Sequence, residues 1–118
     1  MALKNNISET QLQGVILEYL RALGIRCWRV NTTGVPNGKG GLRINREMRG
    51  IADIAVIVPV GKVGASVWLE VKTESGKQLE HQREFQRQVE DSRGFYFVVR
   101  SIEDVQNAIK KVKGFNGS

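Results

Sequence analysis

The chain has 118 residues, of which 41% are hydrophobic and 25% charged, with a formal net charge of +6 and a pI of about 9.8. This composition is typical of one compact globular domain with a single core. No apolar run is long enough to cross a membrane, no secretory signal is visible, and a single cysteine excludes an internal disulfide or a multi-cysteine zinc site. We therefore expect one domain over residues 1–118, with a core over about 8–113 and a flexible tail over 114–118, in a reducing cytoplasm.

The N-terminal part of the chain predicts a helix followed by a strand. Ser8 and Gln11 have the spacing of a capping box, and apolar side chains then recur at helical intervals until Gly24. Residues 26–31 alternate charged and apolar side chains, which favours a strand. Trp28 is assigned to the core of this strand rather than to a base-stacking platform.

Residues 32–50 are rich in glycine and basic side chains and have few apolar anchors, so we expect a long, exposed, mobile loop. The segment 26–49 carries six basic residues and one acid, and it therefore accounts for +5 of the net charge. Concentrated positive charge favours a nucleic-acid partner over a merely solubilising surface. The candidate DNA contacts are Arg29, Asn31, Lys39, Arg43, Arg46 and Arg49, although a solvated strand face explains Arg29 and Asn31 almost as well.

The remaining sequence predicts a hairpin, a helix, a strand and a last helix. These elements are a strand over 53–58 that Pro59 ends, a strand over 66–72, a helix over 79–89, a strand over 95–99 and a helix from Ser101. The element order is α-β-β-β-α-β-α. The simplest arrangement that buries these elements is an α/β fold, with a mixed four-stranded sheet between helices.

Charged residues in two of these apolar strands indicate a catalytic site. Asp53 opens one strand, while Glu70 and Lys72 share one face of the next. If the hairpin pairs as expected, both carboxylates lie within reach of one Mg²⁺ or Mn²⁺ ion. Such an ion polarises a phosphodiester and lowers the pKa of its bound water, and Lys72 orients that water or offsets charge on the phosphate.

The alternative for Glu-x-Lys in a strand is an exposed ion pair of little energetic value. Here the two residues lie among Trp68, Leu69 and Val71, where charges are costly unless they serve a purpose.

Two further polar residues are candidates for the same site. Glu9 lies in the first turn of the first helix, where it either favours the helix dipole or reaches the metal, directly or through water. Gln82 shares a helical stripe with Phe85 and Val89, and an inward-facing glutamine needs a partner. The site beside Lys72 would supply that partner, whereas the alternative is a side chain that turns out to solvent.

Four short motifs together resemble a known family. In chain order they are Glu9-x-x-x-Gln13, Gly50-x-x-Asp53, Glu70-x-Lys72 and Gln82-x-x-Phe85. This series is similar to the virus-type replication-repair nuclease (VRR-NUC) domain of the PD-(D/E)XK superfamily, from about Ser8 to Val105. Ala52 stands where the superfamily often has proline, a residue that shapes the backbone rather than supplying chemistry.

The resemblance implies a restriction-endonuclease-like fold and divalent-metal cleavage of DNA. Asp53 and Glu70 would be metal ligands together with the Val71 carbonyl, Lys72 the catalytic lysine, Gln82 a supporting residue and Glu9 the helix-one acid. Free-standing members are typically small phage or bacterial proteins, similar to Holliday-junction resolvases, which act as dimers.

We therefore expect a homodimeric, structure-selective DNA endonuclease that uses Mg²⁺ or Mn²⁺. It would act in replication, repair or recombination, in the cytoplasm of a bacterial or phage-infected host cell. One alternative is a non-catalytic nucleic-acid-binding module. The other is a sequence-specific restriction-type endonuclease, against which the lack of a visible recognition segment counts.

Overall fold

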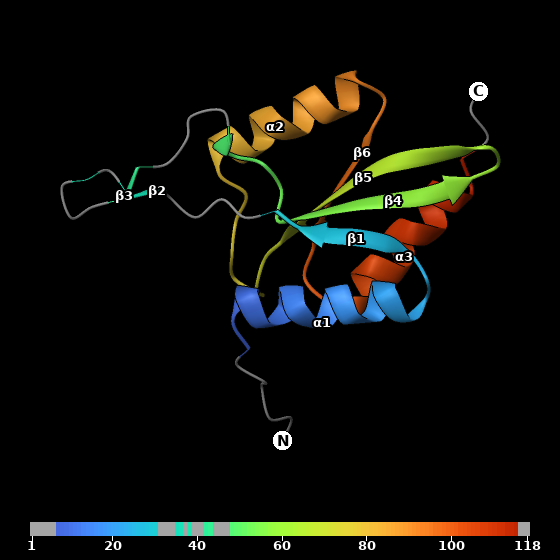
Figure 1. The fold of residues 1–118 in the computed structure, drawn as a ribbon, viewed down its shortest axis with the longest axis horizontal. Helices are drawn as coiled ribbons and strands as arrows, with labels where there is room; N and C mark the ends of the chain where they lie inside the picture. Colours follow the sequence, from blue (N-terminus) through green and yellow to red (C-terminus); the bar gives the residue numbers. More distant parts are fainter. Residues whose placement is uncertain (1–6, 31–34, 37, 39–41, 44–47, 116–118) are drawn as a thin grey trace.

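A four-stranded mixed sheet forms the centre of the computed structural model, which describes residues 7–30, 35–36, 38, 42–43 and 48–115 (Figure 1). The strand order is β1-β4-β5-β6; β1 pairs antiparallel with β4, β4 antiparallel with β5, and β5 parallel with β6. The strands are β1 (Arg26–Arg29), β4 (Ile54–Val60), β5 (Val63–Val71) and β6 (Phe95–Val99). The predicted fold class and the predicted order around this sheet are confirmed.

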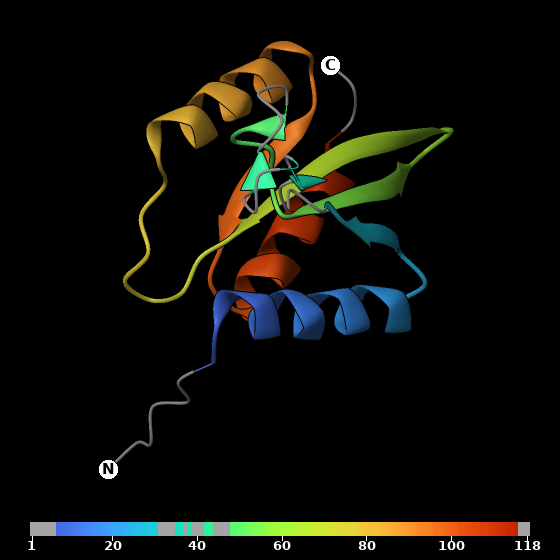
Figure 2. The ribbon, with the colours of Figure 1, turned by 60° about the vertical axis from the view of Figure 1, so that its left-hand side comes forward.

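Three helices cover the two faces of the sheet. Helices α1 (Glu9–Ala22) and α3 (Ile102–Lys113) lie on one face, and α2 (Glu80–Asp91) lies on the other (Figures 1 and 2). The capping box of α1 is present: the Gln11 N–H donates to Ser8 Oγ at 3.1 Å, and the Ser8 N–H donates to Gln11 Oε1 at 2.8 Å. None of the helices that the structure describes is both long and apolar enough to cross a membrane.

The two faces of the sheet bury different kinds of side chain. Val67, Leu69 and Val71 of β5 are fully buried in the larger apolar cluster, under α1 and α3. The alternate residues of β5 face α2, where a smaller cluster contains Ala52, Val89 and Tyr96 with Trp68, Phe85 and Val98 packed against it. Glu70 and Lys72 therefore lie on the face that has the smaller core.

The predicted loop over 32–50 contains a short pair of strands that the sequence did not indicate. Residues Val35–Pro36 (β2) and Leu42–Arg43 (β3) pair antiparallel in a separate two-stranded sheet.

Pro59 does not end its strand as predicted, because β4 continues to Val60. The Val30 N–H donates to the Asp53 carbonyl at 2.8 Å. Asp53 and every second residue after it therefore direct their backbone N–H and C=O groups toward β1. Pro59 belongs to this set, but pairing with β1 stops at Arg26 opposite Ile57. The missing N–H of Pro59 therefore removes no bond from the sheet.

The prediction that Trp28 belongs to the core is wrong. Its side chain is 50% exposed, whereas that of Cys27 is only 4% exposed and packs in the larger cluster. Strand β1 lies at the edge of the sheet, and Trp28 points to the face that carries α2. Ile57, on the same face of β4, is 46% exposed, so α2 leaves this half of the sheet open.

Gly50 fixes the approach of the chain to Asp53. Its φ is +84°, and a side chain at this position would overlap the carbonyl of His81 in the first turn of α2. Only glycine satisfies both conditions without strain. The backbone before Asp53 thus packs directly on α2.

We predict that Gly50→Ala lowers the free energy of unfolding by about 3 kcal/mol or more, through backbone strain and overlap together. Gly24→Ala is the matched control, because Gly24 has a φ of +77° but nothing within 4 Å of an added Cβ. That variant should lose about 1 kcal/mol, from strain alone. Urea unfolding measures both, and equal losses would show that packing on His81 is unimportant.

Candidate active site

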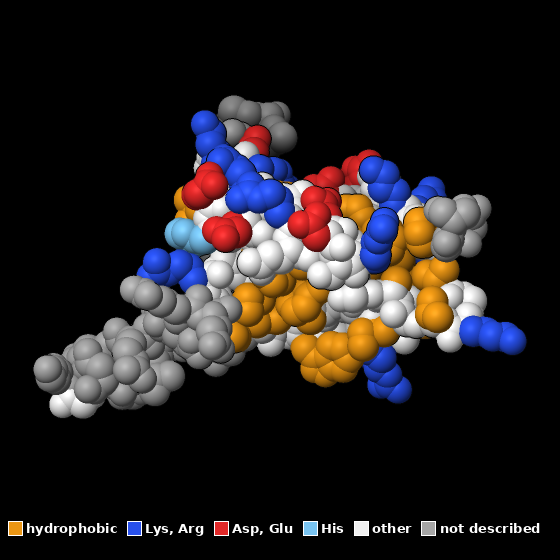
Figure 3. Space-filling model, turned by 90° about the horizontal axis from the view of Figure 1, so that it is seen from above, with side chains coloured by type: hydrophobic (Ala, Val, Ile, Leu, Met, Phe, Trp, Pro, Cys, Tyr) orange, Lys and Arg blue, Asp and Glu red, His pale blue; other side chains and the backbone are white. Residues whose placement is uncertain are grey.

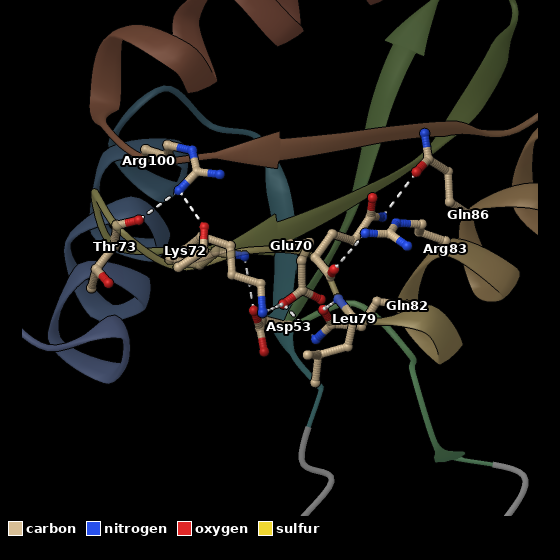
Figure 4. A network of polar contacts seen from close by, with 12 residues as sticks. Asp53, Glu70, Lys72, Thr73, Leu79, Gln82, Arg83, Gln86 and Arg100 are labelled. Carbon is tan, nitrogen blue, oxygen red and sulfur yellow. Dashed lines mark hydrogen bonds and ion pairs between the residues drawn. The ribbon is translucent and has the colours of Figure 1, made fainter.

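Asp53 lies in the bend before β4 and is held from both sides. Its backbone carbonyl accepts the N–H of Val30, and its Oδ2 accepts the N–H of Val71 at 2.8 Å. The regular pairing of β4 with β5 ends at Ile54 opposite Leu69. The carboxylate of Asp53 therefore continues the connection between the strands by one further residue, and this fixes its direction relative to β5 (Figure 4).

Glu70 is the most unusual ionisable residue that the structure describes. It is only 2% exposed; its Oε2 accepts from Gln82 Nε2 at 3.2 Å and lies 3.6 Å from Lys72 Nζ. Its Oε1 is buried and has no hydrogen-bond partner among the described residues. Burial raises the pKa of Glu70 from 4.5 to about 8; the Asp53 carboxylate adds to this rise and Lys72 opposes it. A buried carboxylate oxygen without a partner is what a bound cation would satisfy.

Lys72 follows directly after β5 and is 7% exposed. Its backbone N–H donates to the Val99 carbonyl at 3.0 Å. The loop that follows is held by Arg100, whose Nη1 donates to the carbonyls of Thr73 at 2.6 Å and Gly76 at 2.7 Å (Figure 4). The backbone on each side of the lysine is thus fixed.

Arg100 was missed by the sequence analysis. It follows the strongest strand signal in the chain, but no motif or spacing linked it to a loop 24 to 27 residues earlier.

Gln82 links the start of α2 to the acidic pair. Its Oε1 accepts the N–H of Leu79, the N-cap of α2, at 2.8 Å, while its Nε2 donates to Glu70. The expected partner of this inward-facing glutamine is therefore found, and it is Glu70. One amide thus caps the N-terminus of the helix and positions a carboxylate.

Glu9, on α1, lies near the site because Gly76 has no side chain to occupy the space beside Lys72. A Cβ at Gly76 would lie 3.2 Å from Glu9 Oε1 and 3.3 Å from Lys72 Cδ, so both side chains border the same glycine. No ion pair joins Glu9 to Lys72 within the described part of the chain. Its position in the first turn of α1 suits the helix dipole, and its carboxylate borders the same glycine as Lys72; a metal-binding role for Glu9 stays a prediction.

Two of the candidate DNA contacts, Arg29 and Arg49, have described side chains. Arg29 Nη2 donates to the Thr10 carbonyl at 3.3 Å, so its guanidinium lies against α1, and Arg49 is exposed beside Gly50. The other candidates lie outside the described residues: Asn31, Lys39, Arg46 and the side chain of Arg43. Asp53, Glu70, Lys72 and Gln82 are brought together, whereas the role of the basic residues stays a prediction.

The donor groups at this site fit a hard divalent cation. The Val71 N–H points to Asp53, and because both backbone groups of a strand residue point to the same side, its carbonyl does too. Two carboxylates and a carbonyl suit Mg²⁺, which keeps water and substrate phosphate in its other positions. Among the residues described, no three His, Cys, Asp or Glu are grouped to hold an ion alone. The set is therefore unlike a structural zinc site.

Comparisons with known proteins show the fold. A solved structure titled "VRR_NUC domain" matches with a TM-score of 0.58 and 23% identity, covering 92% of this chain and 97% of its own. A second, titled "VRR_NUC domain protein", matches with a TM-score of 0.59 and 15% identity, covering 92% and 89%. No protein-family model and no curated protein matches the chain. The chain has the fold of VRR-NUC domains, and the resemblance seen in the sequence is confirmed at this level.

We predict a characteristic pH dependence of stability for the metal-free protein. Because the pKa of Glu70 is raised in the folded state, the native protein binds more protons than the unfolded chain between about pH 4.5 and about pH 8. The contribution of the protonated carboxyl is full below this window and is lost as the pH rises through it. Glu70→Gln should therefore gain stability relative to wild type as the pH rises from about 5 to about 9.

Urea unfolding in EDTA across this range measures the difference. Glu18→Gln, an exposed position on α1, is the matched control and should follow the wild-type profile. Parallel profiles for Glu70→Gln and wild type would contradict the raised pKa.

Proposed function

We propose that the chain is a metal-dependent DNA endonuclease. The observation that carries the proposal is the buried Glu70, which lies beside Asp53 and Lys72 and has one carboxylate oxygen without a partner. Burying such groups costs stability, and perturbed ionisable groups cluster at functional sites. The shared fold with VRR-NUC domains supports the same interpretation.

Asp53, Glu70 and the Val71 carbonyl would hold Mg²⁺ or Mn²⁺. A bound ion of this kind would polarise the scissile phosphodiester and lower the pKa of a coordinated water. The ammonium of Lys72, 3.6 Å from Glu70, offsets negative charge that develops on the phosphate. Gln82 keeps the Glu70 carboxylate in position during this reaction.

The substrate that we propose is branched or otherwise structured DNA, in a role like that of a Holliday-junction resolvase in replication, repair or recombination. A domain of this size contacts a limited length of DNA, and cutting both strands of a symmetric branch requires two sites. A homodimer meets this requirement. The single, buried Cys27 is compatible with the reducing cytoplasm of a bacterial or phage-infected cell.

The proposal is tested by incubating the protein with a four-way junction, a flap, a nicked duplex and a linear duplex, in Mg²⁺, in Mn²⁺ and in EDTA. We expect metal-dependent scission, fastest on the branched DNAs. Binding without scission in either metal would favour a non-catalytic nucleic-acid-binding module. Cutting of the linear duplex at one sequence would favour a restriction-type endonuclease.

We predict that Lys72→Ala lowers the cleavage rate in Mg²⁺ by at least about 100-fold, because the developing phosphate charge loses its compensating cation. DNA affinity should change little. Lys62→Ala, in the turn between β4 and β5, removes the same charge away from the site and serves as the control. Equal cutting by Lys72→Ala and wild type would remove the lysine from the mechanism.

Replacing Arg43, Arg46 and Arg49 together by glutamine should weaken DNA binding and flatten its salt dependence. Each lost phosphate contact reduces the slope of log affinity against log salt by about 0.9, so the change is at most about three. The matched control replaces Lys110, Lys111 and Lys113, three exposed cations of α3, which covers the face of the sheet opposite to that of Glu70 and Lys72. An unchanged slope in the arginine variant would show that the loop does not contact DNA.

A further inference from the structure

Strand β1 presents a free edge to solvent. The Val30 N–H donates to the Asp53 carbonyl, so Trp28 and Arg26, at two-residue intervals, turn their backbone groups toward β4. The backbone groups of Cys27 therefore point away from the sheet. Within the ranges that the structure describes, no strand pairs with β1 on this side.

A hollow of about 330 Å³ lies along this edge. Its walls are formed by Arg21, Gly24, Ile25, Arg26, Cys27 and Trp28. Arg21 belongs to the last turn of α1, and its guanidinium lies close enough to the Cys27 thiol to oppose the rise in pKa that burial causes. The hollow is at the lower end of the range for small-ligand sites, about 300–1,000 Å³, so it admits a group of nucleotide size and not a duplex.

The aromatic wall of the hollow lies near the acidic pair. Trp28 is opposite Ala55, and Asp53 is two residues from Ala55 on the same face of β4. Strand geometry places the backbones of Trp28 and Asp53 about 9 Å apart, a distance that a DNA strand spans within a few nucleotides. Figure 3 shows hydrophobic side chains beside α2 on this face of the molecule.

The charges around the hollow distinguish between two possible ligands, a second copy of the chain and a polyanion. Arg21, Arg26 and Arg29 gather about β1, and two copies that met edge to edge would bring these cations together. A polyanion, in contrast, complements them. An exposed aromatic ring among cations is the combination with which proteins bind single-stranded nucleic acid, because every base has a face that stacks.

We propose that the hollow along β1 binds an unpaired nucleotide of the DNA strand that leaves the active site. Its base stacks on Trp28, and its phosphates pair with Arg26 and Arg21. This inference rests on the proposed function, since it takes DNA as the substrate. It makes an unpaired segment close to the cut the feature by which structured DNA is selected.

The experiment compares wild type with Trp28→Ala, Trp28→Phe and Val63→Ala, an exposed apolar residue at the far end of the hairpin. The probes are a forked duplex with 2-aminopurine in its single-stranded arm and a blunt duplex of equal length, both in EDTA to prevent cleavage. Trp28→Ala should bind the fork about tenfold more weakly and the blunt duplex equally, because only the fork supplies a base for stacking. Trp28→Phe should keep most of the affinity, and Val63→Ala all of it.

The 2-aminopurine emission adds a readout that a merely structural role would not change. It should be quenched by wild type and Trp28→Phe and not by Trp28→Ala. Equal binding of the fork by Trp28→Ala and wild type would overturn the inference. So would a change in oligomeric state of Trp28→Ala by analytical ultracentrifugation, because the edge would then join two copies.

The two proposals fail separately. If the protein cuts no DNA but Trp28→Ala loses affinity for the fork, the nuclease proposal fails and the nucleotide-binding hollow stands. If structured DNA is cut in Mg²⁺ but fork binding is unaffected by Trp28→Ala, the proposal that the hollow binds a nucleotide is wrong and the nuclease proposal stands.

Discussion

The hydrogen bond from the Val71 N–H to the Asp53 carboxylate is the constraint on which the site depends. It ties the beginning of β4 to the end of β5 just where the regular ladder of the hairpin stops. It also depends on the register of that hairpin. A slip of one residue would turn Glu70 and Lys72 to the opposite face, into the apolar cluster under α1 and α3. The core of the protein and the position of its acids are therefore set by the same pairing.

Strand β5 contributes to the larger apolar core with one face and to the candidate site with the other. Val67, Leu69 and Val71 are buried among aliphatic side chains, while Glu70 and Lys72 are buried among polar partners. The partner of Glu70 comes from an element distant in sequence, because Gln82 belongs to α2. Arg100, which follows β6, likewise holds the loop after Lys72 through the Thr73 and Gly76 carbonyls. Helix α2, which covers the smaller core, thus supports Glu70 through Gln82. The small size of this apolar core leaves room for polar side chains.

Much of the architecture was predictable because it depends on local patterns. The capping residues of α1, the helical stripes and the alternation in β5 are short-range signals, and they placed Glu70 and Lys72 on one face correctly. The wrong predictions concern residues whose position depends on the neighbouring strand of the sheet. In β1 both Cys27 and Trp28 are apolar, so the sequence allowed either to face the core, and the register of β1 against β4, with Cys27 opposite Val56, decided.

Pro59 is an error of the same kind, since its place in β4 depends on where β1 begins. The role of Arg100 required the tertiary structure, because its hydrogen bonds join segments far apart in the chain. The role of Gly50 in packing likewise appears only once α2 is in place. Since no side chain fits between Gly50 and His81, the glycine of Gly-x-x-Asp is required for packing on α2, whereas the aspartate belongs to the candidate site. If the proposed function is correct, a homologue that had lost cleavage could exchange Asp53 for asparagine, whose side-chain oxygen also accepts the Val71 N–H, but could not exchange Gly50. The glycine of the pattern alone would then not distinguish an inactive homologue from an active one.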